Sequence, residues 1–186
     1  AIFETPLGVV VDRQNRLWTI DHGNHGTGTP RLLAFDLDTG GVAHDHEFDS
    51  SVAELGSFLQ DLQVDSTGEH VFIADVSFWR KNPGLVVYEI ETGTARRVLE
   101  SDESVSAQDW LIRNPTKDMR FFGGLVVLKP GVDGIAIDRD DEWLYYGAMT
   151  HDTMFRIKVT DLLDGTPCEG ALAARFGVEA FDDLPA

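Results

Sequence analysis

The chain has 186 residues, 42% of them hydrophobic, which is enough for one ordinary domain with a sizeable core. Its 32 acidic and 15 basic residues give a formal net charge of −17. This charge argues against nucleic acid or an anionic membrane surface as a partner, because both require a positive face. Cys168 is the single cysteine, so no internal disulfide forms, and no apolar run of about 18 residues predicts a membrane span.

The first predicted unit spans about residues 7–50 and contains four strands. "LGVVVDRQNRLWTID" consists of two apolar runs around an Asp-led turn, "LLAFDLDTG" supplies the third strand and "GVAHDHEFD" the fourth. Apolar runs without alternation, such as "GVVV", are typical of strands that are covered on both faces. On the outer strand, His44 and His46 share one face, and we expect them on a solvated edge that discourages pairing with another chain.

The loop "DHGNHGTGTP" lies between the second and third strands of this unit. Two histidines three residues apart invite a metal assignment. A loop lacks the helical geometry by which such a pair converges, however, and the glycines account for its shape. We therefore expect a loop at the mouth of the domain, with His22 and His25 as candidate contacts of a bound ligand.

The second predicted unit, about residues 59–100, repeats the first. "DLQVDSTGEHVFIAD" and "LVVYEIETG" match it at the constant spacing of 53 residues that separates Asp12 from Asp65. A constant offset over many positions indicates an internal repeat. Its loop "SFWRKNPG" offers Phe78, Trp79 and Arg80. These residues either cover an aromatic or amine ligand or pack onto the neighbouring unit, and the pattern favours neither.

The third predicted unit, about residues 133–181, follows an insertion. The step from Asp65 to Asp138 is 73 residues instead of 53, which places the insertion at about residues 101–130. Within it, "SVSAQDWLIRN" reads as a short helix and "FFGGLVVLKPG" as an extra hairpin. The third unit opens with "DGIAIDRDDEWLYYGA", and its loop "AMTHDT" makes Thr150 and His151 candidate residues of the ligand mouth.

Four-stranded antiparallel units repeated every 40–50 residues or so are typical of the blades of a β-propeller. We therefore predict an all-β fold that consists of three such blades. Closed rings of this kind need roughly four to eight blades. The chain is thus expected to be part of a larger ring, whose remaining blades come from the same protein or from further copies.

The order of the motifs resembles the major royal jelly/Yellow protein family. "NRLWTID", "PRLLAFDLDTG", "FLQDLQVD", "GLVVYEIETG" and "DGIAID" carry the resemblance, which extends from about residue 7 to residue 158. It implies a six-bladed β-propeller of which this chain is about half, and a secreted or periplasmic location. Some family members bind small amines. A more distant likeness connects the chain to propellers of the regucalcin and gluconolactonase type, which are sugar lactonases.

Two carboxylates near the start of the predicted innermost strands are candidate ligands of a divalent cation, Ca²⁺ or similar. Asp61 and Asp133 open neighbouring inner strands, where their oxygens could converge at the channel. The lactonase likeness implies a metal held by a Glu, an Asn and an Asp, and Asp133 matches that Asp. Gln60 stands where the Asn would be. The alternative is that both carboxylates line a wet channel and accept bonds from backbone N–H groups.

Other aspartates recur at turns and strand ends. Asp12, Asp65 and Asp138 each end an inner strand and begin a short turn, a place where an aspartate side chain bonds to nearby backbone amides. A structural role explains their recurrence. Asp21 and Asp75 end the second strands, and we favour loop-holding hydrogen bonds over ligand contact for both.

These observations leave three functions open. The leading one is binding of a small organic ligand at the channel mouth, by Asp61, Asp133, Trp79, Thr150, His151, His22 and His25. The second is metal-dependent hydrolysis of the sugar-lactonase kind, in which the metal would polarise a lactone carbonyl. The third is a propeller that serves as an interaction scaffold. The sequence contains no clear general base beyond the two inner carboxylates.

Overall fold

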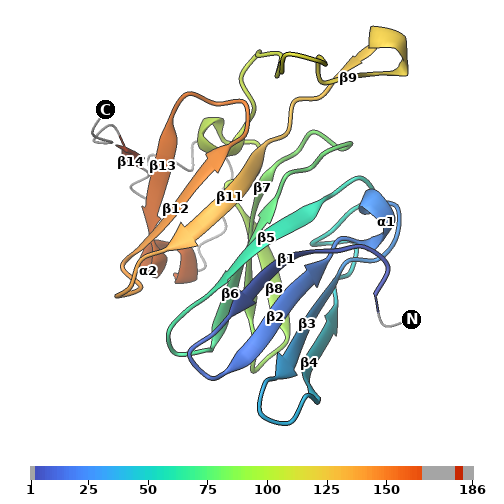
Figure 1. Ribbon diagram of the computed structural model, residues 1–186. Helices are drawn as coiled ribbons and strands as arrows, with labels where there is room; N and C mark the ends of the chain where they lie inside the picture. The colour runs from blue at the N-terminus through green and yellow to red at the C-terminus, as the bar shows by residue number, and fades with distance from the viewer. Residues whose placement is uncertain (1–2, 165–178, 182–186) are drawn as a thin grey trace.

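The fold consists of antiparallel sheets in the computed structural model, which describes residues 3–164 and 179–181 (Figure 1). Cys168 lies outside the described residues. The first sheet contains β1 (Pro6–Val11), β2 (Arg16–Asp21), β3 (Arg31–Asp36) and β4 (Val42–Glu47), with α1 (Gly23–Gly26) between β2 and β3. The second contains β5 (Leu59–Val64), β6 (His70–Asp75), β7 (Gly84–Glu89) and β8 (Thr94–Val98). The third contains β11 (Val132–Ile137), β12 (Trp143–Ala148), β13 (Met154–Lys158) and β14 (Glu179–Phe181), with α2 (Val159–Leu163) after β13.

Each of these three sheets is four-stranded, and its strands pair in chain order. Neighbouring strands are antiparallel in all three sheets. The predicted all-β fold with four-stranded antiparallel sheets is confirmed. The described part of the chain contains no helix that is long and apolar enough to cross a membrane.

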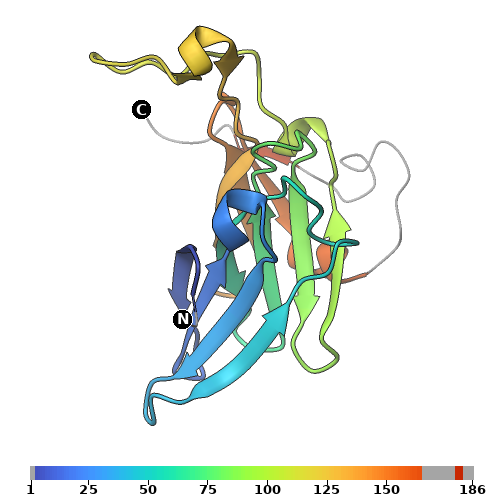
Figure 2. The same ribbon diagram turned by 90° about the vertical axis from the view of Figure 1, so that its right-hand side faces the viewer.

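The insertion between the second and third sheets contains short elements. They are η1 (Glu103–Val105), β9 (Arg120–Phe121), η2 (Phe122–Gly124) and β10 (Val126–Val127). β9 and β10 form the expected hairpin, which projects beyond the sheets in both views (Figure 2). The expected helix at residues 104–114 is wrong, since only the single turn η1 forms. The Asp102 carboxylate caps this turn at the Ser104 N–H, 2.9 Å away, and the Ser104 hydroxyl accepts a bond from Tyr146 of the third sheet.

The second sheet is buried on both faces, which explains its uninterrupted apolar runs. Alternate residues of β6 point to opposite sides: Ile73 packs against the first sheet, and Phe72 packs against the third. The "LVVY" run of β7 behaves in the same way. Within the described residues, "GVVV" is not covered on both faces as predicted. Val9 and Val11 are 62% and 53% exposed, because no sheet in the described residues covers that side of β1.

The first and second sheets also meet through a histidine pair that the sequence placed on a solvated edge. His44 Nε2 lies 2.8 Å from the Tyr88 hydroxyl, and the rings of His44 and His46 lie 5.6 and 4.6 Å from the Tyr88 ring. Both histidines are half-buried. Burial raises the pKa of Tyr88 to about 12. The solvated-edge interpretation is therefore wrong, because β7 of the neighbouring sheet carries a tyrosine that reaches β4.

The turn aspartates have the structural role that was expected. The Asp12 carboxylate accepts bonds from the N–H groups of Gln14 and Arg16, at 2.9 and 2.8 Å. Asp65 and Asp138 likewise accept bonds from backbone amides four and five residues further on. Each carboxylate therefore closes the hairpin turn that it begins.

Candidate functional site

Each innermost strand carries a β-bulge near its start, at corresponding places in the three sheets. The bulges lie between Pro6 and Val9, between Leu59 and Asp61, and between Val132 and Gly134. A bulge inserts one extra residue and turns nearby side chains out of the regular alternation. The extra residue of β11 is Asp133. The extra residue of β5 is Gln60, and Asp61 directly follows it. Two carboxylates of neighbouring sheets thereby lie near enough for the charge of Asp61 to act on Asp133, although they do not occupy equivalent positions of the repeat.

The Asp61 carboxylate connects the two inner strands. Its Oδ1 accepts a bond from the Leu62 N–H at 2.9 Å, and its Oδ2 accepts one from the Ile135 N–H of β11 at 3.0 Å. Gln63 donates to the Ile135 carbonyl at 3.2 Å. The side chains of β5 thus hold β11 in place, which matches the alternative of backbone bonding rather than metal ligation.

Asp133 has an uncommon environment for a carboxyl. Burial, and next the nearby charge of Asp61, raise the pKa of Asp133 above its usual value. Its Oδ1 is buried and has no hydrogen-bond partner among the described residues. Residues 3–164 contain no group of three or more histidine, cysteine, aspartate or glutamate side chains that could hold a metal ion. Because the Asp61 oxygens already serve backbone amides, the pair does not fit a lactonase-type metal by itself, and a metal at Asp61 and Asp133 stays a prediction.

A row of aromatic rings connects loops of the first and second sheets. The His22 ring stacks on Phe58 at 4.2 Å, Phe58 packs on Phe78 at 5.4 Å, and Phe78 meets Trp79 at 5.0 Å. Trp79 Nε1 donates to the His25 carbonyl at 3.1 Å. The structure therefore brings His22, His25 and Trp79 together, as parts of one loop cluster.

Within this cluster the two histidines differ in exposure. His22 is 3% exposed and its Nδ1 accepts a bond from the His25 N–H at 3.0 Å, whereas the His25 side chain is exposed. Burial, and next the charge of His25, lower the pKa of His22, against the opposing effect of Asp21. The most exposed residues of this cluster are thus His25 and Trp79, and Trp79 is 45% exposed.

Thr150 and His151 lie elsewhere, at the base of the insertion. The Thr150 carbonyl accepts a bond from the Gln108 N–H at 2.9 Å, and its hydroxyl lies 3.5 Å from the Pro130 carbonyl. His151 Nδ1 accepts a bond from the Thr153 N–H at 3.0 Å. Both side chains are buried, and Thr150 contacts the insertion through Gln108 and Pro130.

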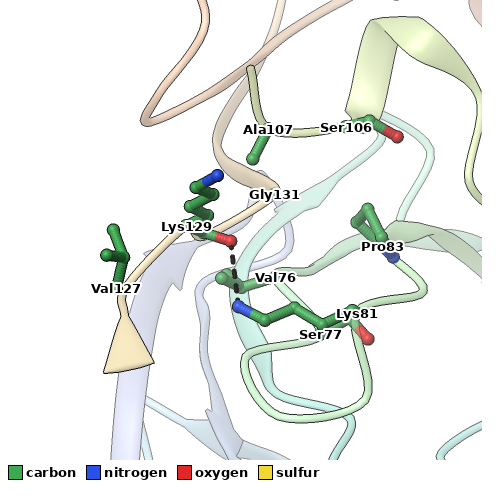
Figure 3. Close-up of a pocket in the computed structure, with 9 residues that line it drawn as sticks. All are labelled: Val76, Ser77, Lys81, Pro83, Ser106, Ala107, Val127, Lys129 and Gly131. Atoms are coloured by element: carbon green, nitrogen blue, oxygen red, sulfur yellow. Dashed lines mark hydrogen bonds between the residues drawn. The ribbon is translucent and has the colours of Figure 1, made fainter. Parts of the chain in front are cut away.

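A cavity of about 410 Å³ lies between the β6–β7 loop and the insertion, just before β11 (Figure 3). Its lining is mostly apolar, with two serines and two lysines. The lining residues are Val76, Ser77, Lys81, Pro83, Ser106, Ala107, Val127, Lys129 and Gly131. The volume falls within the range of about 300–1,000 Å³ that ligand pockets occupy. The cavity is therefore the strongest candidate for a binding site.

The two lysines give the cavity its charge. Lys81 Nζ donates to the Lys129 carbonyl at 3.3 Å, a bond drawn in Figure 3. Burial, and next the charge of Lys129, lower the pKa of Lys81. Lys129 Nζ pairs with Asp109, whose side chain is 92% exposed. The site thus concentrates positive charge in a protein that is strongly acidic as a whole.

Asp75 and Arg97 hold the loop that carries Lys81. Asp75 Oδ1 accepts bonds from the Phe58 and Ser77 N–H groups at 2.7 and 2.8 Å, and its Oδ2 pairs with Arg97 at 2.6 Å. Arg97 also donates to the Asn82 carbonyl at 2.9 Å. The expectation that Asp75 holds a loop is confirmed. Asp21 does the same in the first sheet, where it accepts bonds from three backbone N–H groups.

Sequence reasoning missed the lysines of the cavity. It considered Trp79 and Arg80 in "SFWRKNPG", but Arg80 pairs with Glu54 at 2.9 Å. The available signal was that Lys81 and Lys129 both stand shortly before a Pro-Gly pair, in "KNPG" and "KPG". That pattern does not reveal that they lie together.

Comparisons with known proteins place the chain among propeller-like folds. The family model described as major royal jelly protein matches residues 5–175, which confirms the resemblance inferred from the motifs. The structure is similar to Kuenenia stuttgartiensis hydrazine synthase, with a TM-score of 0.58 and 13% identity, over 84% of this chain and 40% of that chain. It is also similar to a structural genomics protein of unknown function from Bacteroides thetaiotaomicron VPI-5482, with a TM-score of 0.48 and 16% identity, over 84% of this chain and 30% of that one. No curated protein sequence matches. At such low identity the likeness concerns the fold alone, and the chain spans less than half the length of either structure.

Proposed function

Because this chain belongs to the major royal jelly protein family, we propose that it is about half of a six-bladed β-propeller and that it binds a small organic ligand. The proposal of a larger ring is supported by the exposed apolar side chains on the outer faces of the first and third sheets. Leu7, Val9 and Val11 of β1 are about half exposed or more. At the third sheet, Met154 of β13 and Met149, which follows β12, are 40% and 53% exposed. These are the faces on which further blades would pack.

The single observation that carries the binding proposal is the cavity between the β6–β7 loop and the insertion. It combines an apolar lining with a few polar groups, which is the usual composition of a small-molecule site. It also lies beside the loops that follow the second strands, where the ligand mouth was expected. The aromatic cluster of His25 and Trp79 belongs to the same set of loops.

The proposal is tested by ligand-observed NMR with three small probes of one shape: benzoate, benzamide and benzylamine. Binding of at least one probe is expected, and its signal should disappear in Ala107→Trp, because the indole fills the cavity. The matched control is Ala43→Trp on the exposed face of β4. Absence of binding by all three probes to the folded protein would refute the cavity as a ligand site, as would equal binding by both variants.

A second candidate function is metal-dependent hydrolysis of the lactonase type. The observation in its favour is the buried, unpartnered oxygen of Asp133 beside Asp61. A metal there would need further ligands beyond this pair. Calorimetric titration with Ca²⁺ tests it: heat of binding that Asp133→Asn abolishes would support a metal at this pair, whereas the absence of heat in the wild type would reject a metal site in this chain.

A further inference from the structure

We propose that the cavity selects small organic acids, with the acid group held by the Lys81 and Lys129 ammonium groups and the apolar body held by the apolar lining. The inference rests on the proposed binding function and names the chemical class of its ligand. It starts from the charges around the cavity. Among the described residues that line it, two are cationic and none is acidic. An anion is the complement of such a lining.

The charge of Lys81 has no carboxylate against it in the cavity. Its ammonium bonds to a neutral acceptor, the Lys129 carbonyl, and burial together with the second lysine disfavours its charged form. An ammonium has three N–H donors, so two remain beside the one used. A bound carboxylate would accept one of them and compensate both cations at once.

The Lys129 ammonium can turn to a ligand at little cost. Its partner Asp109 is almost fully exposed, and ion pairs at such exposed positions contribute little to stability. In Figure 3 the Lys129 side chain rises beside Ala107 while Lys81 lies below the Lys129 carbonyl, so the two cations approach the cavity from different elements. An acid group between them would connect the β6–β7 loop to the insertion.

A serine supplies a third donor. The Ser77 hydroxyl oxygen accepts a bond from the Asn82 N–H at 2.8 Å, which directs its own O–H away from that amide and lets it donate to a ligand. Ser106 is different, because its hydroxyl donates to the Asp102 carbonyl at 2.6 Å and keeps only acceptor capacity. Of the polar side chains that line the cavity, the two lysines and Ser77 therefore have hydrogen-bond donors to offer, which again favours an anion.

The remaining lining defines the body of the acid. Val76, Pro83 and Val127 offer apolar surface, and a volume of about 410 Å³ accommodates a ring or a branched chain rather than a bare inorganic ion. An amine of the same shape would place a third positive charge beside Lys81 and Lys129. The cavity is thus expected to discriminate against amines.

The experiment compares benzoate, benzamide and benzylamine as calorimetric titrants of the full chain. Benzoate is expected to bind about tenfold or more tightly than benzamide, the difference of one charge-assisted hydrogen bond. Lys81→Met and Lys129→Met should each reduce the benzoate affinity by a similar factor, and Lys81→Arg should retain most of it. The matched control is Lys117→Met, which removes the same charge from the part of the insertion that precedes β9, where Lys117 packs on Phe121.

The outcomes distinguish a failure of the acid specificity from a failure of small-ligand binding itself. Equal affinities for benzoate and benzamide, or tighter binding of benzylamine, would overturn the acid specificity and leave small-ligand binding standing. A loss in Lys117→Met as large as in Lys81→Met would also overturn it, because the effect would then come from net charge. Binding of none of the probes to the folded wild-type chain would reject the binding function itself.

Discussion

Replacement of Arg97 by methionine is the most direct test of how the cavity loop is held. The Arg97 and Asp75 side chains are 5% and 0% exposed, and their charged groups lie 2.6 Å apart. Burial disfavours the Arg97 charge, but Asp75 and then Glu100 outweigh it and raise the pKa of Arg97 above its usual value. Arg97 also donates to the carbonyls of Val52 and Asn82. Methionine keeps much of the apolar stem and removes all of these bonds.

The expected loss is large because a buried charge stays behind. Removal of one partner of a buried ion pair typically costs about 3–5 kcal/mol. For a chain of this size each kcal/mol lowers the melting temperature by about 2–4 °C, so Arg97→Met should melt roughly 6–20 °C below the wild type. A double variant that carries Asp75→Asn together with Arg97→Met should recover part of the lost stability. An asparagine amide oxygen still accepts the hydrogen bonds of the Phe58 and Ser77 N–H groups, and it carries no charge.

The assay is thermal and urea unfolding followed by circular dichroism. Arg113→Met is the matched control, because the Arg113–Asp118 pair is 67% and 42% exposed and should contribute less than about 1 kcal/mol. If Arg97→Met were no less stable than Arg113→Met, the reasoning from burial would be refuted. If the double variant were as unstable as Arg97→Met, the unpaired charge would not be the cause.

Three further predictions concern the contacts between sheets. Gly8→Ala should destabilise the fold by about 1–3 kcal/mol in urea unfolding, because its Cβ would lie 2.4 Å from the Gln60 carbonyl. Gly134→Ala, with no atom within 4 Å of the new carbon, should change stability by less than about 0.5 kcal/mol, and equal effects would contradict the close approach of β1 and β5. Tyr88→Phe should lose about 1 kcal/mol by removing the hydroxyl bond to His44, and a neutral result in the same assay would argue against that bond. Burial, and next the charge of His46, lower the pKa of His44 below 6.5 in the folded protein. The contribution of neutral His44 to stability is therefore present above pH 6.5 and is lost as the pH falls through the pKa of the folded state. His44→Gln should remove this part of the acid destabilisation, and an unchanged pH profile of stability would show that His44 does not contribute.

Much of the fold could be predicted because its determinants are local. The spacing of 53 residues, the Asp-led turns and the apolar runs each depend on residues that are neighbours in sequence. A carboxylate such as Asp65 bonds to amides four and five residues further on, so its role follows from the turn that contains it. The loop-holding role of Asp75 could be inferred for a similar reason, because it ends a strand and precedes a loop.

The failures have a common physical cause, which is contact between elements that are distant in sequence. His44 was expected in solvent, but Tyr88 of the next sheet covers it. Val9 was expected to be buried, and it is exposed because the described residues place no sheet against it. The helix expected at residues 104–114 does not form, because Ser104 bonds to Tyr146 and the chain turns away after Val105.

The sequence by itself determined the antiparallel four-stranded repeats, the turns that close them and the family to which the chain belongs. These features repeat with a period, and each repeat is specified by residues close to one another in the chain. Only the tertiary structure decided where the cavity lies and which charges line it. Lys81 and Lys129 are 48 residues apart, and the second belongs to an insertion that follows no repeat. Because the path of the insertion depends on packing against the third sheet, the sequence alone could not predict that the two lysines line one cavity.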